Sequence, residues 1–484
     1  MNNPIRRLSL LVALLFCTLF IASSWIQFVQ AQELRDKPGN RRTLLATYSR
    51  ERGAILVAGE AIARSESTPD ELKFQRTYPQ GKLYSHITGY YSFLYGAGGG
   101  LESAENDLLT GESAQLLYRR LGDLLTGRRS TGVNLELTIN PQAQRAAQEG
   151  LGDQRGAVVA LDPKTGAILA LVSHPQYDPN LLAGHTTAPV QKAWADLNGA
   201  RTKPMSNRAI AGDLYPPGSV FKIVTAAAAL SSGRFTDSSQ VPGPKVLDLP
   251  ETTAGLVNDW GGACDDGTVT LTRALEKSCN TAFGWLGMEL GGQAMRDQAA
   301  KFGFGQQFGI PMAVTPSSLP AQMNKAQEAQ SAIGQYDVRV TPLQVAMISA
   351  AVANKGTVMA PFIVKQTRGG DLEVIDQTAP KEIGQAVSPE VAQALTAMME
   401  KVVESGTGTR AKISGVAVAG KSGTAQHGEG RAPHAWFTSF APADDPKVAV
   451  AVVIEDGGNA GNEAAGGRIS APIARDVMKA VIEQ

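Results

Sequence analysis

The stretch Tyr215-Pro-Pro-Gly-Ser-Val-Phe-Lys222 places a Pro-Pro-Gly turn directly before a serine and a lysine that lie three residues apart. The apolar, alanine-rich run Ile223–Leu230 follows and predicts a buried helix. At the start of a helix, residues three apart share a face, so the amine of Lys222 can reach the hydroxyl of Ser219. A lysine that loses its proton near an apolar wall or beside a second cation can activate a serine. The stretch therefore predicts a serine nucleophile with a lysine base.

Two further strings lie later in the chain, Ser278-Cys-Asn280 and Lys421-Ser-Gly-Thr424. Each string alone is common, because S-x-x-K is usually a capping serine with a solvated lysine and Lys-Ser-Gly usually forms a turn. In this order, about 60 and then about 140 residues apart, the three strings match the S-x-x-K, S-x-N and K-[ST]-G set of penicillin-recognising serine acyltransferases. Lys421 is the candidate for the second cation near Lys222.

Shorter motifs accompany these strings in both halves of the chain. They are Arg52-Gly53, Arg76, Tyr78-Pro79, His86–Gly89, Gly100-Leu-Glu102, Gly156–Gly166, Asn207-Arg-Ala209, Gly334-Gln335, Thr341-Pro-Leu-Gln344, Ser405-Gly-Thr-Gly408 and His434-Ala-Trp-Phe437. With them, the chain resembles the class B penicillin-binding proteins, which are monofunctional peptidoglycan D,D-transpeptidases, and it is most similar to their short actinobacterial members. It departs from the family pattern at Ser422, where threonine is commoner, and at Tyr336, where a glycine often stands.

The resemblance implies a role for each residue of the first two motifs. Ser219 attacks the carbonyl of the penultimate D-Ala of a stem peptide, and Lys222 takes its proton. Ser278 relays a proton to the leaving amine, while Asn280 hydrogen-bonds the backbone amide of the donor.

The third motif is expected to bind the end of the donor. Lys421 supplies positive charge for the terminal carboxylate and lowers the pKa of Lys222, and the substrate or β-lactam contacts come from Ser422, Gly423 and Thr424. The backbone N–H groups of Ser219 and Thr424 would form the oxyanion hole. β-Lactams mimic the donor and stop at the acyl-enzyme.

Other activities use the same motifs. A D,D-carboxypeptidase or a β-lactamase resolves the acyl-enzyme with water, and the motifs alone do not separate these from a transpeptidase. From a different class, the chain could be a β-lactam sensor or a non-catalytic divisome scaffold. A sensor needs a cytoplasmic signalling segment, and only about seven residues precede the apolar N-terminal run. A scaffold would be expected to have lost a motif residue.

Composition excludes other classes of function. The chain has 484 residues and a net charge of zero, so there is no electrostatic case for nucleic-acid binding. The five histidines are scattered and no H-E-x-x-H or Cys/His cluster occurs, so no metal site is expected. Without a phosphate-binding glycine-rich motif, no cofactor is expected either.

The N-terminus indicates a membrane protein. Arg6-Arg7 precede an uncharged run from Leu8 to about Val29, which is long enough to span a bilayer as a helix. The basic pair predicts a cytoplasmic N-terminus, with the remaining chain outside the cell membrane. Val29-Gln30-Ala31 mimics a signal-peptidase site, but the apolar run exceeds that of a cleaved signal, which favours a retained single-pass anchor.

Three segments are expected along the chain. Residues 1–31 form the cytoplasmic tip and transmembrane anchor, residues 32–150 a tether and a pedestal or interaction domain, and residues 151–484 the transpeptidase domain. The resemblance implies peptidoglycan stem peptides and β-lactams as ligands, and a SEDS-type glycosyltransferase with divisome or elongation proteins as partners. The sequence does not reveal the acceptor amine or a choice between division and elongation.

The hydrophobic pattern predicts an α+β domain in which helices cover an antiparallel sheet. Strands are predicted at Ala54–Val57, Asn134–Ile139, Ala157–Leu161, Ile168–Val172, Trp436–Phe440 and Val448–Glu455, and short strands and loops at Tyr84–Phe93. Helices are predicted at Asn106–Leu125, Gln142–Leu151, Phe221–Leu230, Thr270–Leu290, Pro342–Ala353, Pro389–Val403 and Ile469–Ile482.

Cys264 and Cys279 are the two cysteines outside the apolar N-terminal run. In an oxidising compartment they could form a disulfide. Because Cys279 is the middle residue of the S-x-N string, a bridge would brace one catalytic wall against the Trp260–Asp266 loop. The alternative is a small buried Cys279 and a free loop thiol at Cys264.

Overall fold

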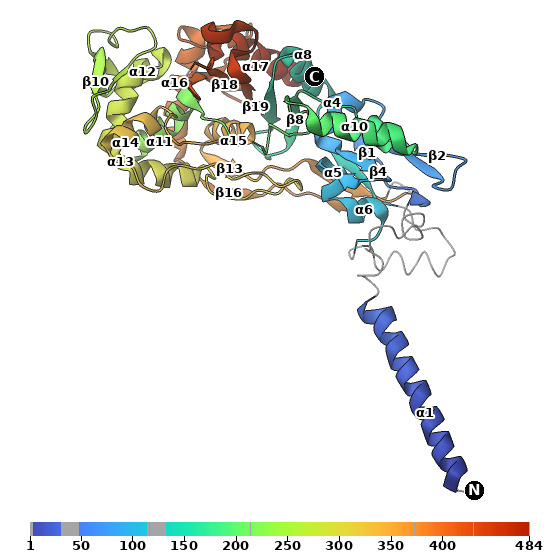
Figure 1. Ribbon diagram of the computed structural model, residues 1–484. Coiled ribbons are helices and arrows are strands. Elements are labelled where there is room, and N and C mark those ends of the chain that lie inside the picture. The colour runs from blue at the N-terminus through green and yellow to red at the C-terminus, as the bar shows by residue number, and fades with distance from the viewer. Residues whose placement is uncertain are drawn as a thin grey trace. The chain divides into compact units, whose positions relative to one another are not determined.

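A computed structural model describes residues 3–30, 48–113, 116, 132–212, 214–370, 373–428 and 430–483 (Figure 1). The chain divides into two compact units, one of Met1–Glu51 with Glu66–Gln75 and one of Arg52–Ser65 with Arg76–Gln484. The first unit contains helix α1 (Asn3–Ser24), which η1 (Trp25–Val29) continues. Together they form the one helix of the described residues that is long and apolar enough to cross a membrane.

The second unit is built around a five-stranded antiparallel sheet in the order β17-β18-β19-β7-β8. Its strands are β7 (Gly156–Leu161), β8 (Ile168–His174), β17 (Ala419–Ala425), β18 (His434–Ala441) and β19 (Val448–Ile454). Every residue of β18 and β19 is buried, which explains their nearly continuous apolar sequences. The predicted hairpin of β7 and β8 and the two C-terminal strands are confirmed.

Helices cover both faces of this sheet. Helices α8 (Pro141–Leu151) and α17 (Gly466–Ile482) pack on one face, which Figure 1 shows above the strands. Helix α15 (Pro342–Ala353) packs on the other face, with α11 (Lys222–Ser231) and α16 (Pro389–Glu404) in the same core. Alternate residues of each strand enter the two cores, as the period of two requires. The α+β architecture predicted from the sequence is confirmed.

One predicted helix is broken. The sequence predicts a single helix over Thr270–Leu290, but the structure has α12 (Leu271–Lys277) and α13 (Asn280–Lys301) with Ser278 and Cys279 between them. Ser278 adopts a left-handed conformation with φ 61° and ψ 43°, and this ends α12. The hydrophobic period continues through the break, so the pattern gave no sign of it.

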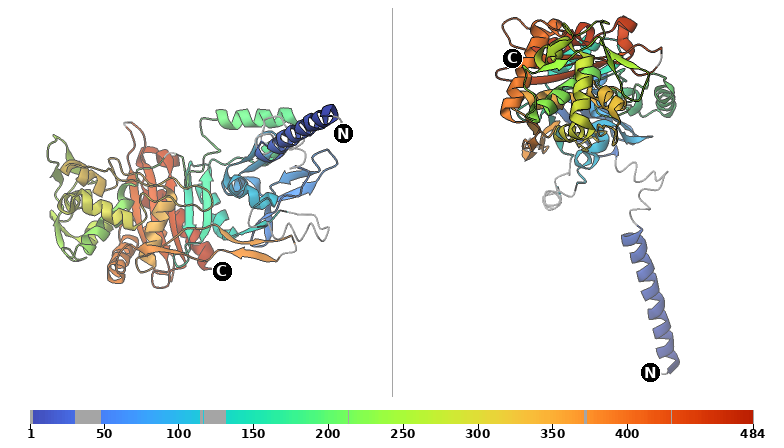
Figure 2. Two further views of the ribbon diagram at one scale, coloured as in Figure 1. Left: turned by 90° about the horizontal axis from the view of Figure 1, so that it is seen from below. Right: turned by 90° about the vertical axis from the view of Figure 1, so that its left-hand side faces the viewer.

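A second, six-stranded sheet has the order β15-β14-β6-β1-β2-β3. Strand β1 (Ile55–Val57) runs parallel to β6 (Asn134–Leu137), and β14 (Val364–Arg368) pairs antiparallel with β6. Figure 2 shows the orange hairpin of β14 and β15 (Val374–Gln377) beside the blue and cyan strands. The sheet thus combines strands from both sides of residue 151.

Two other predictions near the N-terminus need correction. Half of Tyr84–Phe93, expected as strands and loops, belongs to helix α4 (Gly81–Thr88), and only Tyr90–Ser92 is a strand, β4. The helix predicted at Asn106–Leu125 is described as α6 (Asn106–Thr110), which Gly111 ends in a left-handed conformation. Most of the remaining predicted helix lies outside the described residues.

The remaining elements are short or peripheral. They are β2 (Glu60–Ser67), β3 (Phe74–Thr77), β5 (Gly96–Gly98), α5 (Gly100–Ala104), α9 (Asn180–Ala183), α10 (Thr187–Gly199), η3 (Gly218–Phe221), β9 (Gln240–Pro242), β10 (Val246–Asp248), β11 (Gly255–Val257), β12 (Thr268–Thr270), α14 (Lys325–Ala332), β13 (Thr357–Met359), β16 (Glu382–Gln385), η4 (Thr409–Ala411) and η5 (Glu455–Glu463).

A buried ion cluster lies beside the six-stranded sheet. The Glu102 carboxylate accepts one hydrogen bond of 2.6 Å from Arg52 Nε and another of 2.6 Å from Arg76 Nε, and all three residues are buried. Burial alone would raise the pKa of Glu102, but the guanidinium groups of Arg76 and Arg52 outweigh it and hold that pKa below its usual value. The Glu102 carboxylate therefore stays ionised although it is buried.

Candidate active site

The nucleophile predicted from the sequence lies in a tight turn between β-rich and helical segments. Ser219 is in the 3-10 helix η3, and Lys222 begins α11 directly after it. Gly218 has φ 55°, and its N–H donates to the carbonyl of Gly334 over 2.9 Å. A Cβ at Gly334 would stand 2.1 Å from the Gly218 oxygen, so only glycine allows this approach.

Lys222 is fully buried and has only neutral hydrogen-bond acceptors. Its Nζ donates to Asn280 Oδ1 over 2.7 Å, to the carbonyl of Ser278 over 2.8 Å and to Ser278 Oγ over 3.3 Å. Burial lowers the pKa of Lys222 well below its usual value, and the charge of Lys421 lowers it further. The geometry thus favours a neutral amine at this position.

Lys421 approaches the same serine from the sheet. Its Nζ donates to Ser278 Oγ over 2.8 Å and to the carbonyl of Ser422 over 2.9 Å. Burial lowers the pKa of Lys421 to about 7. The Ser278 hydroxyl therefore accepts from both lysines, and the break between α12 and α13 is what places it there.

The third motif lies on β17, an edge strand of the five-stranded sheet. Two cavities open beside it, of about 520 Å³ and about 310 Å³, and Ser219 and Thr424 line both. Ser278, Ser422 and Gly423 line the larger cavity, and Asn280 lines the smaller one. The structure therefore brings all eight motif residues to one place, with Lys222 and Lys421 buried behind it. An open strand edge can pair with an extended peptide.

The S-x-N segment is tied to the loop before it. Cys264 and Cys279 are joined by a disulfide. Asn258 is buried, and its side chain donates to the carbonyl of Gly262 over 2.9 Å and to Thr281 Oγ1 over 3.1 Å. The loop that contains Trp260 is thus held at both ends.

Two residues outside the three motifs also line the site, and the sequence contained a sign of one of them. Asp259 lines both cavities, and its Oδ1 accepts from Asn280 Nδ2 over 2.9 Å. Tyr336, which stands where the family often has glycine, adopts the left-handed conformation with φ 60° and lines the smaller cavity. The departure at Tyr336 was a usable signal in the sequence, whereas nothing in the local pattern identifies Asp259.

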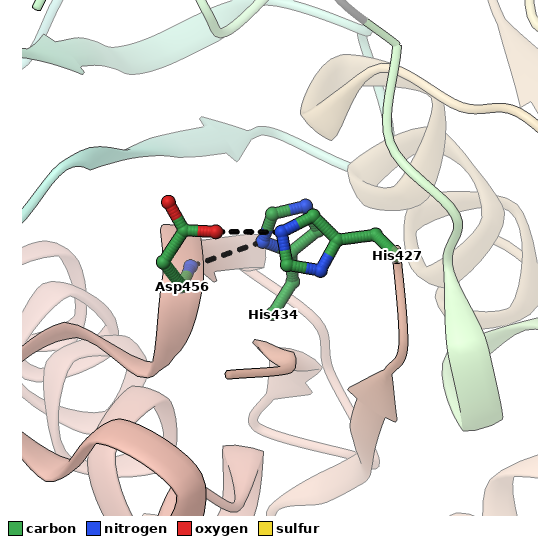
Figure 3. A group of neighbouring side chains, drawn as sticks. All are labelled: His427, His434 and Asp456. Carbon is green, nitrogen blue, oxygen red and sulfur yellow. Dashed lines mark hydrogen bonds and ion pairs between the residues drawn. The ribbon is translucent and has the colours of Figure 1, made fainter. Parts of the chain in front are cut away.

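A group of polar residues lies at one end of the same sheet (Figure 3). His427 Nε2 is 2.6 Å from Asp456 Oδ1, and His434 Nδ1 accepts from the Asp456 backbone N–H over 3.1 Å. Although the three residues could offer ligand atoms to a metal, Arg155 and Arg431 already pair with the Asp456 carboxylate. Two cations at the only carboxylate of the group oppose a divalent ion. Burial, and then His427, lower the pKa of His434 to about 3, so it is neutral.

Comparisons with known proteins agree with this geometry. The model of the penicillin binding protein transpeptidase domain matches residues 156–479, and that of the penicillin binding protein A dimerisation domain matches residues 52–135. The peptidoglycan D,D-transpeptidase PbpA of Mycolicibacterium smegmatis is 42% identical, with 100% of both chains covered. PbpA of Mycobacterium tuberculosis is also 42% identical, with 100% of this chain and 99% of that protein covered.

Solved structures give the same result. The ceftriaxone acyl-enzyme complex of M. tuberculosis penicillin-binding protein A has a TM-score of 0.87 and 42% identity, covering 90% of this chain and 100% of that one. Its penicillin G acyl-enzyme complex has a TM-score of 0.84 and covers 89% of this chain and 99% of that one. The motifs, their convergence on one cavity and these likenesses together show that the chain belongs to the class B penicillin-binding proteins, in the PbpA group of peptidoglycan D,D-transpeptidases.

Proposed function

We propose that this chain cross-links peptidoglycan stem peptides through an acyl-enzyme on Ser219, with Lys222 as the general base. The observation that carries this proposal is the environment of Lys222, which is fully buried among neutral acceptors and close to a second cation. A neutral lysine three residues after a serine can take the serine proton as the oxygen attacks the penultimate D-Ala carbonyl.

Proton delivery to the leaving amine follows from the position of Ser278. Its hydroxyl accepts from both lysines, so it can pass a proton from Lys222 to the amine of the departing D-Ala. Asn280 lines the smaller cavity, and its Oδ1 accepts from Lys222 while its Nδ2 donates to Asp259 Oδ1 and to the carbonyl of Val257. To bind the donor backbone, Asn280 would exchange one of these Nδ2 bonds.

The donor's end would lie in the larger cavity. Lys421, Ser422 and Thr424 offer a positive charge and two hydroxyl groups to the terminal carboxylate. Gly423 lies between them, where a Cβ would stand 3.0 Å from Val220 and 3.1 Å from Trp436, so glycine lets this strand pack closely behind the cavity. The N–H groups of Ser219 and Thr424 would stabilise the oxyanion. A β-lactam would follow the same path and remain as the acyl-enzyme.

Location and partners follow from the N-terminal helix and the family. We infer that Asn3–Val29 is a retained single-pass anchor, with Arg6-Arg7 in the cytoplasm and the transpeptidase domain outside. The division into residues 1–31, 32–150 and 151–484 belongs to this proposal. So does a SEDS-type glycosyltransferase partner in division or elongation, which would supply the glycan strands that this chain does not polymerise.

The test is covalent labelling. Fluorescent penicillin should label the full chain, and mass spectrometry should find one adduct on the peptide that contains Ser219. Ser219→Ala should abolish labelling, and Lys222→Ala should lower its rate on the order of 10³-fold or more, because a nucleophile and its base fail together. Ser232→Ala, on the exposed end of the same helix, is the matched control and should label normally.

A thioester donor separates the transpeptidase from its hydrolytic alternatives. Acyl transfer to an added amine supports cross-linking, whereas hydrolysis alone at every amine concentration would identify a D,D-carboxypeptidase or β-lactamase. Normal labelling of Ser219→Ala would contradict the assignment of the nucleophile.

A further inference from the structure

One exposed carboxylate lies where the two cavities meet Ser219. Among the described residues that line either cavity, Asp259 is the only acid. The larger cavity also contains three cations, Lys277, Arg410 and Arg468. The Asp259 side chain is exposed, and apart from its bond to Asn280 it has no hydrogen bond or ion pair within the described residues. Because the three cations repel a positively charged ligand elsewhere in the cavity, the exposed carboxylate of Asp259 is the place where a cationic group would bind.

Trp260, the next residue in the chain, is also suited to contact a cationic group. Trp260 is 47% exposed and lines the larger cavity, although a side chain of this size is usually buried. Trp260 follows Asp259 in the chain and lines the same cavity, and an indole ring attracts cations such as ammonium groups. The Asn258 contacts and the Cys264–Cys279 disulfide hold this loop in place, so the pair is available before a ligand binds.

The reaction requires an ammonium group on this side of Ser219. The leaving D-Ala amine departs from the larger cavity, where its carboxylate would lie against the third motif. Aminolysis of the acyl-enzyme is the same kind of step in reverse, so the entering amine must take the place of the leaving one. In neutral solution that amine arrives protonated, as R–NH₃⁺.

We propose that Asp259 and Trp260 form the subsite that receives the ammonium group of the acceptor and orients it toward the acyl-enzyme. The inference rests on the proposed transpeptidase function and names the acceptor side of that site. Asp259 is a binding residue here, and the proton chemistry stays with Lys222.

An acceptor R–NH₃⁺ must lose a proton before its nitrogen can attack the acyl-enzyme. One proton passes to the neutral amine of Lys222, and the freed nitrogen attacks the acyl carbonyl. The bond from that carbonyl to Ser219 Oγ then breaks and an amide bond forms. Lys222 returns a proton to Ser219 Oγ, and the second proton of the nitrogen is released to water, so the net reaction yields the amide, the free serine and one proton.

A purely structural role for Asp259 makes a different prediction. If its only task were to hold Asn280, whose Oδ1 accepts from Lys222, its loss would slow acylation and every kind of transfer by the same factor. The subsite instead predicts an effect specific to acceptors that carry a positive charge.

The experiment uses the full chain in detergent micelles with an acyl-D-alanyl thioester donor. Transfer to D-alanine and to D-lactate is measured in parallel by mass spectrometry, because the two acceptors differ only in carrying an ammonium or a hydroxyl group. Asp259→Asn should lower the ratio of D-alanine to D-lactate transfer about fivefold, the size expected for one solvent-accessible charge pair. Trp260→Leu should lower it about twofold.

Asp266→Asn is the matched control, because Asp266 is exposed on the same loop and lines neither cavity. It removes the same charge and should leave the ratio unchanged. An unchanged ratio in Asp259→Asn, or an equal change in Asp266→Asn, would overturn the subsite. Efficient penicillin labelling without transfer to D-alanine by the unaltered protein would instead contradict the transpeptidase function, and the subsite with it.

Discussion

Two parts of this protein bury pairs of cations, and they do so with opposite results. Beside the six-stranded sheet, Arg52 and Arg76 share the buried carboxylate of Glu102 at 2.6 Å each. In the active site, the buried groups are Lys222 and Lys421, and the hydroxyl of Ser278 joins them in place of an acid. The two regions differ in the group that the two cations share, because the cationic side chains are buried in both.

Burial leaves the arginines permanently charged in the first region and allows a lysine to act as a base in the second. A carboxylate compensates the loss of hydration, so the arginines stay ionised and the Glu102 pKa falls below its usual value despite burial. Neutral acceptors compensate only in part, so burial lowers the pKa of Lys222 and of Lys421. Arginine suits the first role because it keeps its proton, and lysine suits the second because it can lose it.

Replacing the lysine of the active site by arginine should have the largest effect. Lys222→Arg keeps a positive side chain but cannot act as a base, so fluorescent penicillin labelling should fall on the order of 10³-fold or more. Thermal unfolding should be measured in parallel to show that the variant is folded. Labelling within a few-fold of the unaltered rate would show that Lys222 does not need to lose its proton.

Removing the shared carboxylate tests the other region. Glu102→Gln should leave two buried guanidinium groups without a counter-charge and lower the free energy of unfolding by about 3–5 kcal/mol. Denaturant unfolding measures this, with the exposed Glu149→Gln as a control that should change little. The folded fraction should still bind penicillin, and a stability equal to that of the control would mean that the cluster is not needed to hold the sheet.

The disulfide tests what holds the region around the two buried lysines in place. Reducing the bridge between Cys264 and Cys279 should cost about 3 kcal/mol in the loop-closure model and slow acylation without unfolding the protein. Thiol titration of the folded, non-reduced chain should detect Cys17 alone. Detection of Cys264 and Cys279 as well would contradict the bridge.

The smallest effect concerns pH. In the proposed mechanism acylation needs Lys222 neutral and Lys421 charged; burial lowers the pKa of both amines, and the charge of Lys421 lowers the pKa of Lys222 further. As pH rises, the acylation rate should therefore first increase while Lys222 loses its proton. It should then decline through the Lys421 pKa of about 7, by up to about tenfold per pH unit. Stopped-flow acylation by a chromogenic β-lactam measures this, and Lys421→Arg should remove the decline. A rate that keeps rising above neutral pH would contradict the assigned roles.

The sequence predicted the features that depend on residues close together in the chain. The helical turn that contains Ser219 and continues into α11 at Lys222, the hairpin of β7 and β8, and the buried strand β19 all follow from local patterns. The three motifs together also predicted that their residues would meet, although the family resemblance was needed to say so, since about 140 residues separate the second motif from the third.

What the sequence did not predict depends on contacts far along the chain. The pairing of β14 with β6 joins Gln366 to Glu136, and no local pattern encodes such a partner. Asp259 looks like an ordinary loop acid until Asn280 comes within 2.9 Å. The helix break was missed because the apolar period runs through Ser278 unchanged, while the lysines that Ser278 contacts lie 56 and 143 residues away in the chain.

The break between α12 and α13 limits which residues position 278 can accept. A serine in the left-handed region is strained by on the order of 1 kcal/mol, and glycine at position 278 would relieve the strain. Glycine would also remove the hydroxyl that accepts from Lys222 and Lys421. Because both amines are fully buried, losing this acceptor costs at least about as much as the strain that glycine relieves, so stability does not oppose the serine that proton transfer requires.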